Sequence, residues 1–438
     1  MRVIKDVFGL QGLHRIGIKL LAICCLLVGG IYSMDAQDWK FYVNHEVQLT
    51  YGYYFKDLVN SNRTIPELGS QHEIKLNYKT NLTFFSSFKT IFNQHEKGRR
   101  RIWANEAYLG FNKNKVYGKI GRQIIKWGTL TGWSNLDMAN VYDYYDFLRT
   151  DEEALGVFAA DVKFRLKKLQ LQVRLQPSNQ TSRLYFQQNR WIRLPNQIPT
   201  PNGAFLPVQL NEVEKISLKS PTYGLGLNLE TESLDLRLNW YSGQNDIPQR
   251  SISLNPIDLT RPIPFDIQLV YHRLNIASLS LVKLLGEWSV WTEFSHIKNQ
   301  RIEENNQLSS DAYLGLTIGI DRLFIFENPE KQLKLLGQYL KNFTDEAVAY
   351  QVQDLDHVLD HAFLLDADFQ FNYSWKASLR SVLNLSKVSH YLRASLSYKI
   401  KDNFSLLASM EHLSGNAQHF FGYYGDNSRF FLTLKYQL

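Results

Sequence analysis

The sequence has little cysteine and, after its first residues, no long apolar segment. Its 438 residues include two cysteines, Cys24 and Cys25. Both lie in a segment that we expect to be removed, so the mature protein would have no disulfide, no thiol nucleophile and no thiolate metal site. No later stretch reaches the roughly 18 apolar residues that a membrane-spanning helix needs. These absences exclude a disulfide-stabilised fold and a helical membrane protein.

Motifs of several function classes are also missing. Glycine-rich phosphate loops, zinc-ligand spacings and nucleotide fingerprints do not occur, and no nucleophile elbow or catalytic triad motif is present. The net charge of +7 is spread along the chain, whereas a nucleic-acid interface needs a concentrated basic face. We therefore predict no enzymatic activity, no cofactor and no nucleic-acid partner.

The first 36 residues have the features of a secretory signal peptide. A basic start is followed by the apolar run Leu20–Ile31, which is short for a membrane helix and typical of a cleavable signal. We expect cleavage near Ala36. The segment Asp35-Ala36-Gln37 resembles the signal end of exported Bacteroidetes proteins. Residues 37–438 are then one exported domain.

Aromatic residues are abundant, and apolar residues recur at every second position. The chain has 24 Tyr and 26 Phe. In Lys168–Gln176, leucine or valine alternates with glutamine or arginine, which is the period of a strand with one apolar face. The last strand, Arg429–Leu438, alternates strictly. It resembles the C-terminal signal that the barrel-assembly machinery of the outer membrane recognises, although it ends in leucine rather than an aromatic residue.

We count about 18 strands in this pattern and accept 16 to 20, because the long predicted strand Phe265–Lys283 could be two. Short turns alternate with long loops, and both termini fall on the side of the short turns. Bacterial outer-membrane barrels have short periplasmic turns, long external loops and an even number of strands. The sequence therefore predicts an all-β fold, a transmembrane antiparallel up-and-down β-barrel. The alternative is a soluble β-sandwich, which would need a second sheet to cover its apolar faces.

One stretch, Lys115–Asp151, stands apart from the alternation. A strand ends here, and a long aromatic and acidic loop, 125–153, follows. The stretch contains the pattern Gly121, Arg122, Gln123, Trp127, Gly128 and Asp137.

This pattern resembles a family of porin-like outer-membrane barrels found beside RND-type exporters, and more loosely alginate-export barrels and general porins. In the family pattern the aspartate lies among Asn, Asp and Pro residues. Here Asn135-Leu136-Asp137 or Asn140–Asp143 takes that place, without the proline. The resemblance implies an outer-membrane barrel that passes solutes, or one that works with a periplasmic exporter component.

The loop 125–153 is the third external loop, and in general porins that loop folds into the barrel. We hypothesise that it forms the constriction, with acidic groups on the loop facing basic groups on the wall. The alternative is a loop packed on itself outside through its aromatic residues. The predicted pore-lining or constriction residues are Lys119, Gln123, Asp137, Asp143, Asp146, Asp161, Lys163, Arg165 and Arg174.

Three further features have alternative interpretations. The basic cluster Lys97–Arg101 is either a solvated turn or a contact with anionic lipid headgroups. The long loop 177–221 is long enough to plug the mouth or bind a partner. A weak candidate for a divalent-metal site lies in the penultimate long loop, and a solvated loop is the alternative. Its residues are Asp354, Asp356, His357, Asp360 and His361.

The predicted location is the outer membrane of a Gram-negative cell, in contact with lipid and lipopolysaccharide. Barrels of 16 to 18 strands leave a water-filled lumen, so we predict a porin-like channel for small polar or charged solutes. The alternatives are an outer-membrane component of an RND-type export system, or a surface-binding barrel with a plugged lumen. The sequence leaves the solute and the oligomeric state open.

Overall fold

The computed structural model describes the chain from residue 38 to the C-terminus with interruptions. The described residues are 38–58, 63–93, 99–128, 130–148, 154–185, 190–191, 197–199, 205–254, 263–302, 308–343, 359–386 and 388–438. The predicted signal peptide lies outside them. No helix in this part of the chain is long and apolar enough to cross a bilayer.

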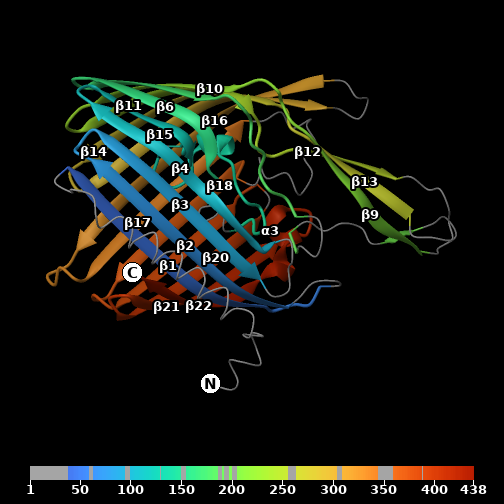
Figure 1. Cartoon of the computed structure of the whole chain (residues 1–438). Helices are drawn as coiled ribbons and strands as arrows, with labels where there is room; N and C mark the ends of the chain where they lie inside the picture. Colours follow the sequence, from blue (N-terminus) through green and yellow to red (C-terminus); the bar gives the residue numbers. More distant parts are fainter. Residues whose placement is uncertain are drawn as a thin grey trace.

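Eighteen strands form one antiparallel sheet, which confirms the predicted number. Each pairs with its neighbours in chain order, and β22 pairs with β1 to close the barrel (Figure 1). The wall strands are β1 (Trp39–Tyr54), β2 (Thr64–Tyr78), β3 (Leu82–Asn93), β4 (Arg101–Lys113), β5 (Val116–Gln123), β6 (Val157–Leu166), β7 (Leu169–Gln176), β10 (Thr222–Glu230), β11 (Leu234–Gln244), β14 (Arg273–Leu285), β15 (Trp288–Ile302), β16 (Leu308–Ile325), β17 (Gln332–Phe343), β18 (His361–Gln370), β19 (Trp375–Asn384), β20 (Ser389–Lys401), β21 (Phe404–Gly415) and β22 (Arg429–Gln437).

The alternation in the sequence separates the two faces of this wall. On β22, Phe430, Leu432 and Leu434 are about 40% exposed on the outer face, while Phe431 and Thr433 between them are buried inside, as is Arg429 before them. Aromatic pairs from neighbouring strands lie close to the short turns; Trp375 and Tyr398, for example, have ring centroids 4.4 Å apart. An apolar outer band bordered by aromatic rings is typical of an outer-membrane barrel.

A second sheet projects from the end of the barrel that carries the long loops (Figure 1). Its strands are β8 (Gln197–Pro199), β9 (Phe205–Ile216), β12 (Gln249–Leu254) and β13 (Ile263–Val270). The breaks in alternation predict long loops over 177–221 and 241–264, and this prediction is wrong at β9 and β12. The two segments pair with β8 and β13 instead of with the barrel wall, and β9 pairs with β13 in parallel.

The single strand predicted over Phe265–Lys283 is also corrected. It is divided between β13 in the second sheet and β14 in the wall. The chain turns at Tyr271 and His272, where Tyr271 N donates to Ile216 O and Asn245 N donates to His272 O. On β13 the apolar residues Ile267 and Leu269 are buried, whereas on β14 Leu279 is exposed on the outer face. Both halves alternate at period 2, so the pattern does not show the break.

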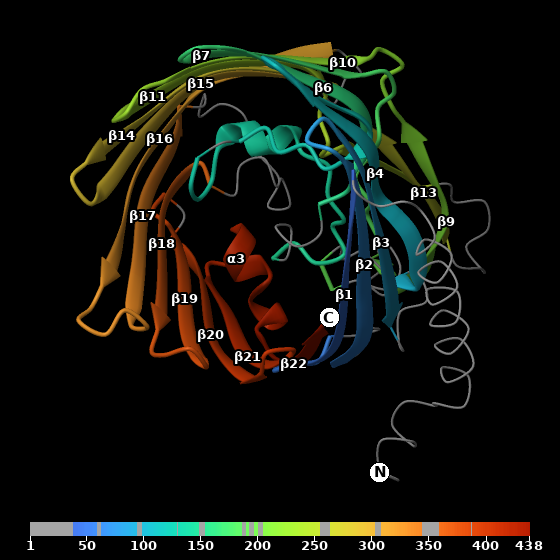
Figure 2. The ribbon, with the colours of Figure 1, turned by 60° about the vertical axis from the view of Figure 1, so that its left-hand side comes forward.

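Two long loops return into the interior of the barrel. Figure 2 shows the 3₁₀-helix η2 (Asn135–Ala139), in cyan-green, and the short helix α3 (Phe420–Tyr423) inside the ring of strands. A further 3₁₀ turn, η5 (Gly425–Asn427), follows α3 and leads into β22.

Candidate functional site

The segment that enters the barrel begins at the end of β5. Gln123 is buried, and its side-chain Nε2 donates to Ala159 O on β6 at 2.9 Å. Gly121 has φ +131°, in the region that favours glycine. Arg122 Nε donates to Asn105 O on β4 at 3.3 Å. These contacts fix the external end of β5 where the chain leaves the wall.

Trp127 then anchors the loop against the wall. Its backbone N–H donates to Asn140 Oδ1 at 3.1 Å. Its ring meets Tyr241 of β11 edge-on, with centroids 4.8 Å apart. The guanidinium of Arg174 on β7 lies 4.6 Å from the Trp127 ring centroid, a cation–π distance. The predicted wall residue Arg174 and the predicted motif residue Trp127 therefore meet in one contact.

Asp137 shapes the loop by accepting hydrogen bonds from it. Its carboxylate accepts from the backbone N–H of Ser134 at 3.1 Å and from Asn140 Nδ2 at 3.0 Å. Together with Ser134 it forms a capping box on η2. A Cβ at Gly128 would come closer to the Asp137 carboxylate than real Cβ atoms approach. The Trp-Gly and Asp parts of the pattern thus belong to one folded unit.

The tip of this unit is bound to the wall across the lumen. The buried carboxylate of Glu293 on β15 accepts from Ser134 Oγ at 2.8 and 3.0 Å and from Asn135 N at 3.0 Å. On β17, Gln338 accepts from Trp133 N at 2.9 Å and donates to Trp133 O at 2.5 Å. Strands β15 and β17 are separated from β5 by several strands in either direction around the barrel.

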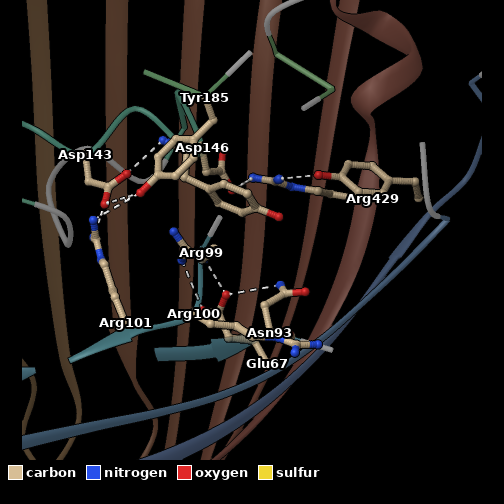
Figure 3. A network of polar contacts seen from close by, with 11 residues as sticks. Glu67, Asn93, Arg99, Arg100, Arg101, Asp143, Asp146, Tyr185 and Arg429 are labelled. Atoms are coloured by element: carbon tan, nitrogen blue, oxygen red, sulfur yellow. Dashed lines mark hydrogen bonds and ion pairs between the residues drawn. The ribbon is translucent and has the colours of Figure 1, made fainter. Parts of the chain in front are cut away.

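The second half of the loop returns to another part of the wall through ion pairs. Asp143 is buried and pairs with Arg101 of β4, and its carboxylate also accepts from the Tyr185 hydroxyl at 3.2 Å. Asp146 pairs with Arg429 of β22 at 2.7 Å. Figure 3 shows both arginines reaching toward these loop carboxylates. The loop therefore contacts opposite sides of the barrel interior.

Arg429, which binds Asp146 of the loop, also contacts two other residues of the wall. It is fully buried, and its guanidinium also pairs with Glu411 of β21 at 2.6 Å and donates to the Tyr54 hydroxyl at 3.1 Å. A buried charge of this kind is tolerated only when it is paired and hydrogen-bonded. Sequence reasoning missed Arg429 and Glu293, because nothing local distinguishes them from other polar residues on the inner face of a strand.

The sequence predicts that the basic cluster Lys97–Arg101 is a solvated turn or a lipid contact. This prediction is wrong for Arg99 and Arg101. Arg99 is 2% exposed and binds Glu67 of β2 at 2.5 and 3.1 Å. Arg101 points inward to Asp143, as described above. Arg100 Nε donates to Asn93 O at 2.8 Å, and this residue is the exposed member (Figure 3). Two of these arginines therefore hold internal carboxylates; Lys97 lies outside the described residues.

Aromatic side chains from three loops meet near the external mouth. Phe147, Trp191 and Tyr424 lie within about 6 Å of one another, with centroid separations of 5.6, 6.0 and 5.1 Å. Phe420 of α3 stacks on Phe147 at 6.2 Å. The Tyr424 hydroxyl donates to Trp191 O at 2.5 Å. The loop 177–221 thus contributes to the interior packing as well as to the second sheet.

The predicted wall charges lie on β5, β6 and β7. Asp161 pairs with Arg174 at 3.4 Å and accepts from Gln172 at 2.7 Å. Lys119 is opposite Asp161 in the strand register, and its ammonium lies 4.4 Å from the Tyr108 ring. Lys163 interacts electrostatically with Asp161 and with three cations, Arg174, Lys119 and Arg237. Arg165 is exposed beside the short turn after β6, away from the loop.

The weak metal candidate is only partly described. Asp354, Asp356 and His357 lie outside the described residues. Asp360 accepts from Asn342 Nδ2 at 3.1 Å, and His361 packs edge-on against the Tyr339 ring. Within the described ranges, no group of three or more His, Cys, Asp or Glu residues is placed to hold a metal ion.

Comparison with solved structures identifies the fold. OccAB1 of Acinetobacter baumannii matches with a TM-score of 0.51 at 9% identity, over 92% of this chain and 97% of that one. OccK3 of Pseudomonas aeruginosa matches with a TM-score of 0.50 at 10% identity, over 91% and 96%. Both are outer-membrane porins. This chain is an outer-membrane β-barrel with a porin-like fold.

At these identities the similarity extends to the fold alone. No family model matches the chain, and no curated protein matches it. The resemblance to barrels found beside RND-type exporters and the Bacteroidetes origin therefore stay predictions.

Proposed function

We propose that this barrel is an outer-membrane channel for small polar or charged solutes, with a path narrowed by the segment 125–148. The observation that supports the proposal most is the double attachment of this segment. It binds Glu293 and Gln338 on one side of the lumen and Arg101 and Arg429 on the other. A segment held on both sides reduces the cross-section of the lumen that an 18-stranded wall encloses.

The sequence predicts acidic groups on the loop facing basic groups on the wall. The charges around the loop in the structure give a different electrostatic field. Asp143 and Asp146 are paired with arginines, and Asp137 accepts hydrogen bonds from its own loop. On β5 to β7 the basic residues Lys119, Lys163 and Arg174 outnumber the one acidic residue, Asp161. A channel lined in this way favours anions over cations.

Single-channel conductance of the refolded protein in a planar bilayer tests this proposal. We expect discrete steps, a reversal potential in a salt gradient that favours the anion, and a several-fold larger step after deletion of residues 130–148. Deletion of residues 255–262, between two strands of the second sheet, is the control and should leave the step unchanged. Unchanged conductance after the first deletion would refute the constriction.

A second candidate is a surface-binding barrel with a plugged lumen. The aromatic cluster of Phe147, Trp191, Phe420 and Tyr424 supports it, because three loops meet inside the mouth. A correctly folded barrel that shows no conductance in the same bilayer experiment would favour this function. A periplasmic exporter partner remains the other prediction, and co-purification from the native membrane would test it.

A further inference from the structure

Glu293 of β15 holds the tip of the loop 125–148 with hydrogen bonds from neutral donors. Its side chain is 0% exposed. The carboxylate accepts from Ser134 Oγ, from Asn135 N and from Ser280 Oγ of β14, at distances between 2.8 and 3.1 Å. Among the described residues, no charged group pairs with Glu293 or acts on it. The charge of this carboxylate is therefore stabilised by hydrogen bonds alone.

The other carboxylates that attach this loop to the wall have arginine partners. Asp143 pairs with Arg101, and Asp146 pairs with Arg429 at 2.7 Å. A neighbouring cation favours the ionised form of a carboxyl group. A buried carboxylate without a cation is costly and takes up a proton instead of keeping its charge. Mild acid therefore acts on the attachment at Glu293 before it acts on the two ion pairs.

The elements packed around Glu293 bring no positive charge to it. On β11, Arg237 lies two strands away in the register and pairs with Asp235 at 3.8 Å. The inward face of β14 has no charged residue. On the loop, Asp137 accepts hydrogen bonds from its own segment, and on β16 the charged residue that follows the position opposite Glu293 is Asp321. Both of these groups are acids and cannot keep Glu293 ionised.

The protonated form of Glu293 has an acceptor on the next strand. Thr317 of β16 is opposite Glu293 in the register and is fully buried. Its Oγ1 has no hydrogen-bond partner among the described residues. Opposite residues of an antiparallel pair have Cβ atoms about 5 Å apart. A carboxylic acid has an O–H to donate, whereas a carboxylate only accepts, so a proton on Glu293 would give the buried hydroxyl of Thr317 its partner.

We propose that Glu293 is a proton switch for the constriction, and that its protonation in mild acid loosens the loop tip and widens the path through the barrel. The ionised carboxylate holds Ser134 and Asn135 with charge-assisted hydrogen bonds, which are stronger than neutral ones. The proton from the medium makes these bonds neutral and turns one oxygen toward Thr317. This inference rests on the proposed constriction and concerns its regulation.

Single-channel conductance at two pH values is the first test. We expect the wild-type step to be at least about twofold larger at about pH 4.5 than at about pH 7.5. E293Q, which has no titratable group at this position, should show the larger step at both pH values. The matched control is E287Q, which removes an exposed carboxylate at the short turn before β15 and should keep the wild-type response. Heat-modifiable gel mobility shows whether each variant has folded.

T317V tests the acceptor of the protonated form. Valine keeps the shape of threonine and removes Oγ1, so protonation of Glu293 becomes less favourable. The midpoint of the conductance change should move to lower pH by about half a unit or more. An unchanged midpoint would overturn the role given to Thr317.

Hydrogen exchange of residues 130–140 gives a second readout that does not depend on ion flow. After correction for the intrinsic effect of pH, exchange in the wild type should be about tenfold faster at the lower pH, because the tip opens more often. In E293Q it should be fast at both pH values. A folded barrel without conductance that shows this behaviour would refute the proposed channel and support the proton switch.

The proposal is overturned if folded E293Q keeps the wild-type response to pH in conductance or in exchange. It is also overturned if exchange of residues 130–140 in the wild type is the same at both pH values. Loss of the response in the control E287Q would overturn it as well, because the response would then not belong to Glu293.

Discussion

The barrel wall and the loop that it encloses are held together in different ways. The wall repeats one interaction, since each strand pairs with two neighbours along its length and turns an apolar face outward. The loop 125–148 depends on a few side chains, chiefly Glu293, Gln338, Arg101 and Arg429. Stability is thus distributed in the wall and concentrated at the loop attachments, and single substitutions should separate the two.

The largest effect is expected for R429Q. Arg429 is buried and paired with Glu411 and Asp146, so its loss removes a buried cation from both carboxylates and leaves Glu411 with the longer Arg393 pair at 3.8 Å. Breaking a buried pair in this way costs about 3–5 kcal/mol of unfolding free energy. Urea unfolding of the refolded barrel measures the change. K435Q on the same strand is the control, because the pair Lys435–Glu46 is partly exposed and should contribute less than about 1 kcal/mol.

A smaller effect is expected for G128A. The new Cβ would press on the Asp137 carboxylate and on Ser134, and overpacking of this kind costs about 1–3 kcal/mol. It should also widen the distribution of single-channel conductance, because Asp137 shapes the loop. G337A is the control, since a Cβ there has its nearest neighbour at 3.8 Å. Equal behaviour of the two variants would contradict the role given to Gly128.

E293Q should lower the free energy of unfolding by less than G128A does. The amide keeps one acceptor oxygen, so the contacts with Ser134 and Asn135 change from charged to neutral, a loss of about 1 kcal/mol. We expect more frequent fluctuations of the open conductance as the loop tip loosens. The control is E287Q, at an exposed carboxylate on the short turn before β15. Identical current noise in E293Q and the wild type would argue against this attachment.

The smallest expected effect is on the pH dependence of stability, at Asp402 in the short turn between β20 and β21. The Tyr373 hydroxyl donates to Asp402 at 2.6 Å, and this hydrogen bond, followed by the charge of Lys399, lowers the pKa of Asp402. A carboxyl with a lowered pKa stabilises the fold above its ordinary value of about 3.9, and this contribution is lost as the pH falls through the lowered pKa. D402N should remove this small dependence in acid unfolding, and a wild-type acid profile in D402N would rule it out.

The barrel could be predicted from the sequence because each strand of its wall alternates apolar and polar residues, a pattern that is visible in a few consecutive residues. Alternation at every second residue separates the outer face of the last strand, with Leu432 and Leu434, from its inner face, and the connector lengths indicate the orientation of the strands. This pattern failed at Phe265–Lys283, where two strands of different sheets follow one another with similar alternation. It also gave no indication that β9 and β12 pair with other loop segments.

The candidate site could be predicted from the sequence only in part. The pattern of Gln123, Trp127, Gly128 and Asp137 marked the loop, and the loop does enter the barrel. Its partners were not predictable, since Glu293 and Arg429 are 156 and 292 residues beyond Asp137 in the numbering of the chain. Charge density alone predicts a surface position for Arg99 and Arg101, because it does not show which way a side chain points.

The sequence by itself determined the wall: a strand number near 18, its apolar outer face and its outer-membrane character. Period 2 is a property of each strand alone, so it can be identified without knowing the neighbours. Only the tertiary structure decided the contents of the lumen. Burying Arg429, Arg99 and Glu293 is tolerable only beside specific partners, and closure of the barrel brings those partners together from distant parts of the chain.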